Sequence, residues 1–117
     1  RLGLALGARQ ETMMGLSGLG DLVLTCSSPQ SRNMSLGIEL GKGRSLDEVL
    51  GERNSVTEGV FTAEAVHALA ERTGVDMPIA HAVHRILNGE GDAGTEMERL
   101  MSRPFKREDV TSEQAKA

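Results

Sequence analysis

The spacing of apolar side chains along the chain predicts an all-α protein with almost no strand. The clearest helix covers residues 58–73, and Gly74 directly after it is placed to end it. Its apolar positions recur at intervals of three and four residues: Val60, Ala63, Val66, Leu69 and Ala70. Such a stripe is typical of a helix that buries one face.

Two shorter helices are predicted from the signals at their ends. Ser31 is placed to cap a helix that runs to about Leu40, where Gly41 and Gly43 follow. Ser45 and Glu48 form a capping-box pattern, which opens a short helix to about Leu50.

Two further helices are predicted near the C-terminal end. One begins at Met77-Pro78 and ends at Asn88-Gly89. Its expected apolar face consists of Ile79, Val83, Ile86 and Leu87. A second capping-box pattern starts at Thr95, and Pro104 closes that segment.

The N-terminal part is less regular. Residues 11–14 predict a single helical turn, and residues 22–25 are apolar enough for either a helix or a buried strand. A helix is favoured because no partner strand is predicted elsewhere. The whole pattern predicts an irregular multi-helix bundle over residues 1–104, followed by a polar tail at 105–117.

Composition limits what such a bundle can do. With 117 residues the chain is one domain, and with 38% apolar residues part of its core is expected to be completed by something outside the chain. The start at Arg1, on an apolar pattern, predicts a boundary inside a longer protein. A net charge of −4 and the lack of Trp and Tyr argue against a nucleic-acid partner. No apolar run is long enough for a membrane span.

Two short patterns in the first third are candidate ligand sites. In Gly18-Leu19-Gly20-Asp21-Leu22 the glycines allow close approach and Asp21 supplies a carboxylate, although a helix junction with an exposed capping Asp has the same pattern. In Ser31-Arg32-Asn33 a capped helix start, a guanidinium and an amide favour an anion such as phosphate. An ordinary helix start with a solvated Arg is the alternative.

A third candidate pattern is Val56-Thr57-Glu58-Gly59. A carboxylate fixed at a helix start can hold the ribose or amide groups of a nucleotide. Acidic residues also occur at helix starts because they favour the helix dipole, so taken alone the pattern is more typical of that role.

Other reactive side chains give weaker signals. The histidines His67, His81 and His84 lack an Asp, Glu or Cys at a familiar ligand spacing, so no metal site is predicted. Cys26 is alone, which excludes an intrachain disulfide and suits a reducing cytoplasm, and nothing near it indicates a nucleophile. Several methionines are expected to fill the core: Met13, Met14 and Met97.

These patterns stand in an order that resembles one enzyme family. The segments that carry the resemblance are 4–8, 11–26, Ser31-Arg32-Asn33, 56–60 and 74–79. Together they resemble the C-terminal domain of bacterial NAD(P)-dependent glycerol-3-phosphate dehydrogenases, from Arg1 to about Pro104. One departure is Met34, because the family often carries a basic residue after Ser-Arg-Asn.

The resemblance implies a fold, a site and a partner domain. The fold is the all-α C-terminal domain of the 6-phosphogluconate-dehydrogenase-like type, which closes the active site of an N-terminal Rossmann domain. The residues that would contact glycerol 3-phosphate or dihydroxyacetone phosphate are Asp21, Thr25, Ser31, Arg32 and Asn33. Those that would contact NAD or NADP are Arg32, Val56 and Glu58. The family's catalytic lysine lies N-terminal to the position of Arg1, so the chain alone is expected to be inactive.

The expected activity is interconversion of glycerol 3-phosphate and dihydroxyacetone phosphate in the cytoplasm, which supplies precursors of glycerophospholipids. A homodimer is a candidate assembly. Two alternatives stay open: a helical interaction module without enzyme activity, and the helical domain of another NAD(P)-dependent dehydrogenase. Binding of a small phosphorylated triol would separate the first alternative from the expected function.

Overall fold

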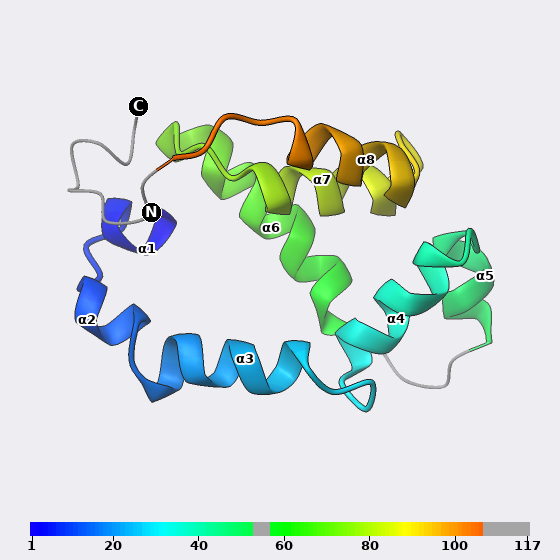
Figure 1. Ribbon diagram of the computed structural model, residues 1–117, viewed down its shortest axis with the longest axis horizontal. Helices are drawn as coiled ribbons and strands as arrows, with labels where there is room; N and C mark the ends of the chain where they lie inside the picture. The colour runs from blue at the N-terminus through cyan, green and yellow to red at the C-terminus, as the bar shows by residue number, and fades with distance from the viewer. Residues whose placement is uncertain (53–56, 107–117) are drawn as a thin grey trace.

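The computed structural model describes residues 1–52 and 57–106, and within these ranges the chain is helical with no strand (Figure 1). The predicted all-α fold is confirmed. In chain order the elements are α1 Leu2–Ala5, α2 Gln10–Met13, the π-helical turn η1 Leu16–Gly20, α3 Asp21–Cys26, α4 Arg32–Gly41, α5 Leu46–Gly51, α6 Glu58–Thr73, α7 Pro78–Leu87 and α8 Ala93–Met101. The tail at 107–117 lies outside the described residues.

The long helix α6 crosses the middle of the molecule and organises the packing (Figure 1). It ends at Gly74, whose φ of 67° is the left-handed conformation that glycine adopts without strain. α7 packs against α6, α8 packs against α7, and α4 contacts both α5 and α8. Within residues 1–52 and 57–106 the buried apolar side chains are few: Leu36, Val49, Ala70, Val75 and Ala82.

The segment from α1 to α3 forms an arm along one side of the molecule, opposite α7 and α8 (Figure 1). Its first helix contacts α6, and η1 contacts both α2 and α3. Large apolar side chains of the arm are exposed, with Leu16 at 91% and Leu24 at 71%. The small core and this exposed arm fit the expectation that something outside the described residues completes the apolar packing. None of the described helices is long and apolar enough to cross a membrane.

Two predictions about α7 and α8 are wrong. Ile79 and Val83, expected on the buried face of α7, are 70% and 42% exposed, whereas Ala82 is buried. A small side chain at a contact lets neighbouring helices approach closely, and this decides which face of α7 is covered. Helix α8 begins at Ala93 rather than after Thr95, because the Asp92 carboxylate accepts the Thr95 N–H at 3.0 Å and caps the helix earlier.

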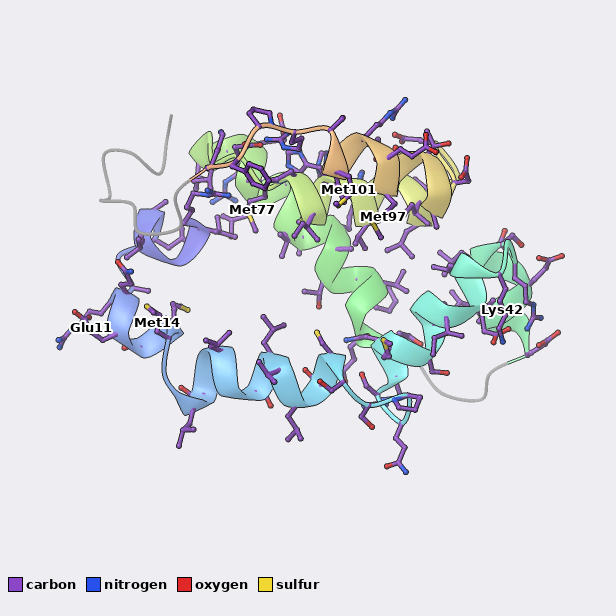
Figure 2. The ribbon with its side chains drawn as sticks, in the orientation of Figure 1. Glu11, Met14, Lys42, Met77, Met97 and Met101 are labelled. Carbon is purple, nitrogen blue, oxygen red and sulfur yellow. The ribbon has the colours of Figure 1, made fainter. Side chains whose placement is uncertain are left out.

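The methionines expected in the core are exposed instead: Met13, Met14 and Met97. On α8 the fully buried position belongs to Glu96, which pairs with Arg85 and Arg99, whereas Met97 is 59% exposed. Met14 directly follows α2, and its side chain lies on the side opposite Glu11, which points outward (Figure 2). Both Met13 and Met14 line a groove described below.

Candidate functional site

The first candidate pattern forms a tight junction between α2, η1 and α3. A Cβ at Gly18 would lie 2.1 Å from the carbonyl oxygen of Met13, so only glycine permits this approach. The π-turn then runs directly into α3, of which Asp21 is the first residue. The glycines therefore set the place from which the Asp21 side chain projects.

Asp21 and Thr25 lie four residues apart on α3 and line the same open groove of about 760 Å³. The Thr25 hydroxyl donates to the Asp21 carbonyl oxygen at 2.9 Å, which leaves its own oxygen able to accept a hydrogen bond. The remaining lining is mostly apolar with a few polar side chains: Arg1, Leu4, Gln10, Met13, Met14, Gly18, Leu19 and Leu22. The structure thus brings two predicted substrate-site residues together in one groove.

The second pattern begins α4 as predicted. The Ser31 hydroxyl oxygen accepts the Met34 N–H at 3.4 Å and caps the helix. Arg32 and Asn33 are the first two residues of α4, and both are exposed. The positive end of the helix dipole makes this helix start favourable for an anion, and Arg32 adds a full positive charge beside it.

The third pattern lies directly against the second. The Gly59 N–H donates to Oδ1 of Asn33 at 3.2 Å, across 26 residues of sequence. A Cβ at Gly59 would lie 2.4 Å from the same oxygen, so glycine is needed for the contact. The hydrogen bond fixes the start of α6 beside the start of α4, so two positive helix ends meet close to the loop that follows α3 (Figure 1).

Glu58 is the first residue of α6 and is exposed beside this junction, and Val56 lies outside the described residues. Thr57 belongs to the third candidate pattern, but the sequence analysis gave it no ligand contact. Its side chain is 1% exposed, and among the described residues its hydroxyl has no hydrogen-bond partner. A buried hydroxyl without a partner is costly, so Thr57 is a further candidate for a ligand contact. Its position before a helix is the only sequence signal that could have indicated it.

The predicted site residues therefore form two groups. Asp21 and Thr25 line the groove on α3, whereas Ser31, Arg32, Asn33 and Glu58 lie at the α4–α6 junction and do not line that groove. The loop after α3 leads directly into α4, so the groups are neighbours along the chain. A carboxylate, an amide, a guanidinium and two helix starts can together recognise a small phosphorylated polyol.

Comparison with known proteins gives a consistent result. Residues 1–98 match the family described as NAD-dependent glycerol-3-phosphate dehydrogenase C-terminus. The chain is 62% identical over 108 residues to a glycerol-3-phosphate dehydrogenase [NAD(P)+] of Parvibaculum lavamentivorans, covering 92% of this chain and 32% of the relative. It is 61% identical over 106 residues to the protein of that name from Rhodospirillum rubrum, covering 91% and 30%.

A solved structure has the same fold. The crystal structure of glycerol-3-phosphate dehydrogenase from Coxiella burnetii superposes with a TM-score of 0.84 at 42% identity, over 88% of this chain and 32% of that one. The chain spans about a third of the length of the relatives it matches.

Proposed function

The chain belongs to the NAD-dependent glycerol-3-phosphate dehydrogenase C-terminal family, and from this premise we propose that it is the substrate-binding domain of such an enzyme. The enzyme interconverts glycerol 3-phosphate and dihydroxyacetone phosphate, with a Rossmann domain as the partner of this chain. The observation that carries the proposal is the hydrogen bond from Gly59 to Asn33, because it gathers Arg32, Asn33 and Glu58 at two helix starts. A non-enzymatic interaction module has no need for this arrangement.

In this proposal each side chain has a chemical task. Arg32 and the start of α4 neutralise the substrate phosphate, and the Asn33 amide N–H groups donate to its oxygens. Asp21 and Thr25 orient the hydroxyl groups, and Asp21 also orients the catalytic lysine of the partner domain. NAD or NADP, when bound, supplies the hydride acceptor or donor. The exposed Glu58 carboxylate and the buried Thr57 hydroxyl fit the polar groups of such a cofactor. Arg32 and Val56 are the other cofactor contacts that the resemblance implies.

Two surface features bear on location and assembly. Cys26, the one cysteine of the sequence, is exposed and unpaired, which suits a reducing compartment such as the cytoplasm. Supply of glycerophospholipid precursors is the metabolic role that we propose for the enzyme's product, glycerol 3-phosphate. The exposed apolar arm supports docking of the Rossmann domain, and a second copy of the enzyme is the next candidate for covering it.

A chimera tests the proposal. The chain would replace the matching third of the Parvibaculum lavamentivorans relative, and the purified chimera would be assayed with dihydroxyacetone phosphate and NADH or NADPH. We expect turnover by the chimera and none by the 117-residue chain alone. In the chimera, Arg32→Ala should lower kcat/KM by roughly ten- to a hundredfold, because a charge-assisted contact in the site is lost.

Arg72→Ala is the matched control, since Arg72 is an exposed guanidinium in the last turn of α6, far from the junction. It should leave kcat/KM close to that of the parent chimera. Arg32→Lys should restore only part of the loss, because an ammonium group cannot make the planar two-point contact. A folded chimera without turnover would contradict the proposed function, and a normal kcat/KM for Arg32→Ala would contradict the assigned phosphate contact.

A further inference from the structure

The α6–α7 pair gathers three metal-ligating side chains away from the site described above. His67 and Glu71 lie four residues apart on α6, and His81 projects from α7. Each residue offers one ligand atom, and these three atoms all lie within 4.8 Å of one another. The spacing of His67 and Glu71 places both on one face of α6, and the packing of α7 adds His81.

Two imidazole nitrogens of this group are buried without a partner. Nδ1 of His67 and Nε2 of His81 have no hydrogen-bond partner within residues 1–52 and 57–106. The two rings meet edge to face with centroids 5.0 Å apart. Buried polar atoms are rarely left unpaired, and a bound ion is one way to satisfy them.

We propose that His67, Glu71 and His81 bind one divalent transition-metal ion of the zinc type. Two imidazoles and one carboxylate suit zinc, whereas magnesium and calcium prefer oxygen ligands alone. Tetrahedral zinc needs ligand atoms roughly 3.4 Å apart, so the three atoms have to draw together slightly. Glu71 is exposed and can swing towards the histidines, and its open side leaves room for water as a fourth ligand.

The site is separate from the proposed substrate site and independent of it. His67 lies nine residues beyond Glu58, which is about 13 Å along the helix. Ligands from α6 and α7 would link the two helices that form the centre of the fold. The proposed ion therefore has the role of a clamp between these helices.

His84 provides a matched control within the same cluster. Its ring stacks on His67 with centroids 3.9 Å apart, yet its Nε2 lies 2.8 Å from a Glu64 carboxylate oxygen and is outside the ligand group. Replacing it removes a neighbouring imidazole without removing a ligand.

The experiment titrates Zn²⁺ and Co²⁺ into the metal-free 117-residue chain, with Cys26→Ser in every sample because a thiolate would compete for the ion. Calorimetry should give one ion per chain, and Co²⁺ should show the visible absorption of a low-coordinate site. His67→Ala and His81→Ala should each weaken binding on the order of 100-fold or more, and Glu71→Gln about tenfold. His84→Ala should change the metal affinity by less than about threefold. This is smaller than the loss that is usual when a residue hydrogen-bonded to a metal ligand is replaced.

A histidine variant that loses its helical circular dichroism has unfolded and cannot report on binding. A second measurement therefore uses the chain with all three histidines intact. In the Cys26→Ser chain, added Zn²⁺ should shift the ring NMR signals of His67 and His81 far more than that of His84. The proposal is overturned by the absence of saturable binding, by unchanged affinity in a folded His67→Ala/His81→Ala variant, or by equal shifts of all three histidines.

Discussion

The Asn33 amide occupies the space that a side chain at position 59 would fill, and Gly59 has none. A Cβ there would meet Oδ1 of Asn33 at 2.4 Å and Nδ2 at 3.2 Å, so the whole amide has to move. Asn33 is a short side chain with few alternative positions, and it is the proposed donor to the substrate phosphate. At the residue scale, then, one glycine fixes the orientation of one amide.

Gly59→Ala should therefore lower catalytic activity, whereas the same change at a helix position with free space should affect only stability. In the chimera we expect kcat/KM to fall about tenfold, because the Asn33 amide loses one hydrogen bond and its fixed position. Gly37→Ala in α4 is the control, since nothing lies within 4 Å of a Cβ there. It should raise the free energy of unfolding by about 0.5–1 kcal/mol and leave kcat/KM unchanged. Equal kinetics for the two variants would show that Gly59 does not position Asn33.

At the scale of elements, a buried ion pair joins α7 to α8. Glu96 is 1% exposed and receives hydrogen bonds from Arg85 on α7 and, at 2.8 Å, from Arg99 on α8. The hydrogen bond from Arg85 and then the attraction of both guanidinium groups lower the pKa of Glu96 below its ordinary value of 4.5. Because the folded-state pKa is lowered, this contribution to stability is present above about pH 4.5 and is lost as the pH falls through the lowered value.

Glu96→Gln should lower the melting temperature at pH 7 by on the order of 10 °C, because two guanidinium groups lose their buried partner. It should also make stability less dependent on pH in the acidic range, since the titrating group is gone. Glu98→Gln, an exposed carboxylate on the same helix, is the control and should change the melting temperature by less than about 2 °C. Thermal unfolding followed by circular dichroism between pH 3 and pH 7 measures both effects. Parallel pH curves for Glu96→Gln and the unsubstituted chain would contradict this account.

At the scale of the molecule, the core is small and the arm from α1 to α3 is apolar on its surface. Leu36 on α4 is 5% exposed, whereas Leu24 on α3 is 71% exposed. If the rest of a dehydrogenase docks on the arm, Leu24 becomes buried only in the larger protein. Leu36 then stabilises the chain by itself, whereas Leu24 contributes to stability only when the partner domain covers it.

Leu24→Ala should change the free energy of unfolding of the 117-residue chain by less than about 0.5 kcal/mol, because an exposed side chain loses little. In the chimera the same change should cost about 1.5–3 kcal/mol, the usual contribution of a buried leucine. Leu36→Ala should cost about 2–5 kcal/mol in both proteins, since it leaves a cavity in the core. Denaturant titrations of the four variants measure these differences. A small effect of Leu24→Ala in the chimera would show that the partner domain leaves this part of α3 uncovered.

The sequence by itself determined the helices whose end signals are local. Residues 58–73 form α6 as predicted, because Gly74 stops the helix through its own backbone conformation. Ser31 and Ser45 cap α4 and α5, since a cap needs only a side chain and the N–H three residues later. The order of the motifs also determined the family. The helix ends depend on residues close together in sequence, and the family pattern depends on the order of the residues and not on their contacts.

Tertiary structure alone decided which faces are buried and which distant residues meet. The chain pattern could not show that Ala82 rather than Ile79 faces the neighbours of α7, because burial depends on which helix packs there. It could not place Asn33 against Gly59, nor His81 beside His67 and Glu71, because these contacts join different helices of the packed chain. The sequence determines which side chains are present, whereas their arrangement in space is decided only when helices pack and bring remote positions within a few ångströms.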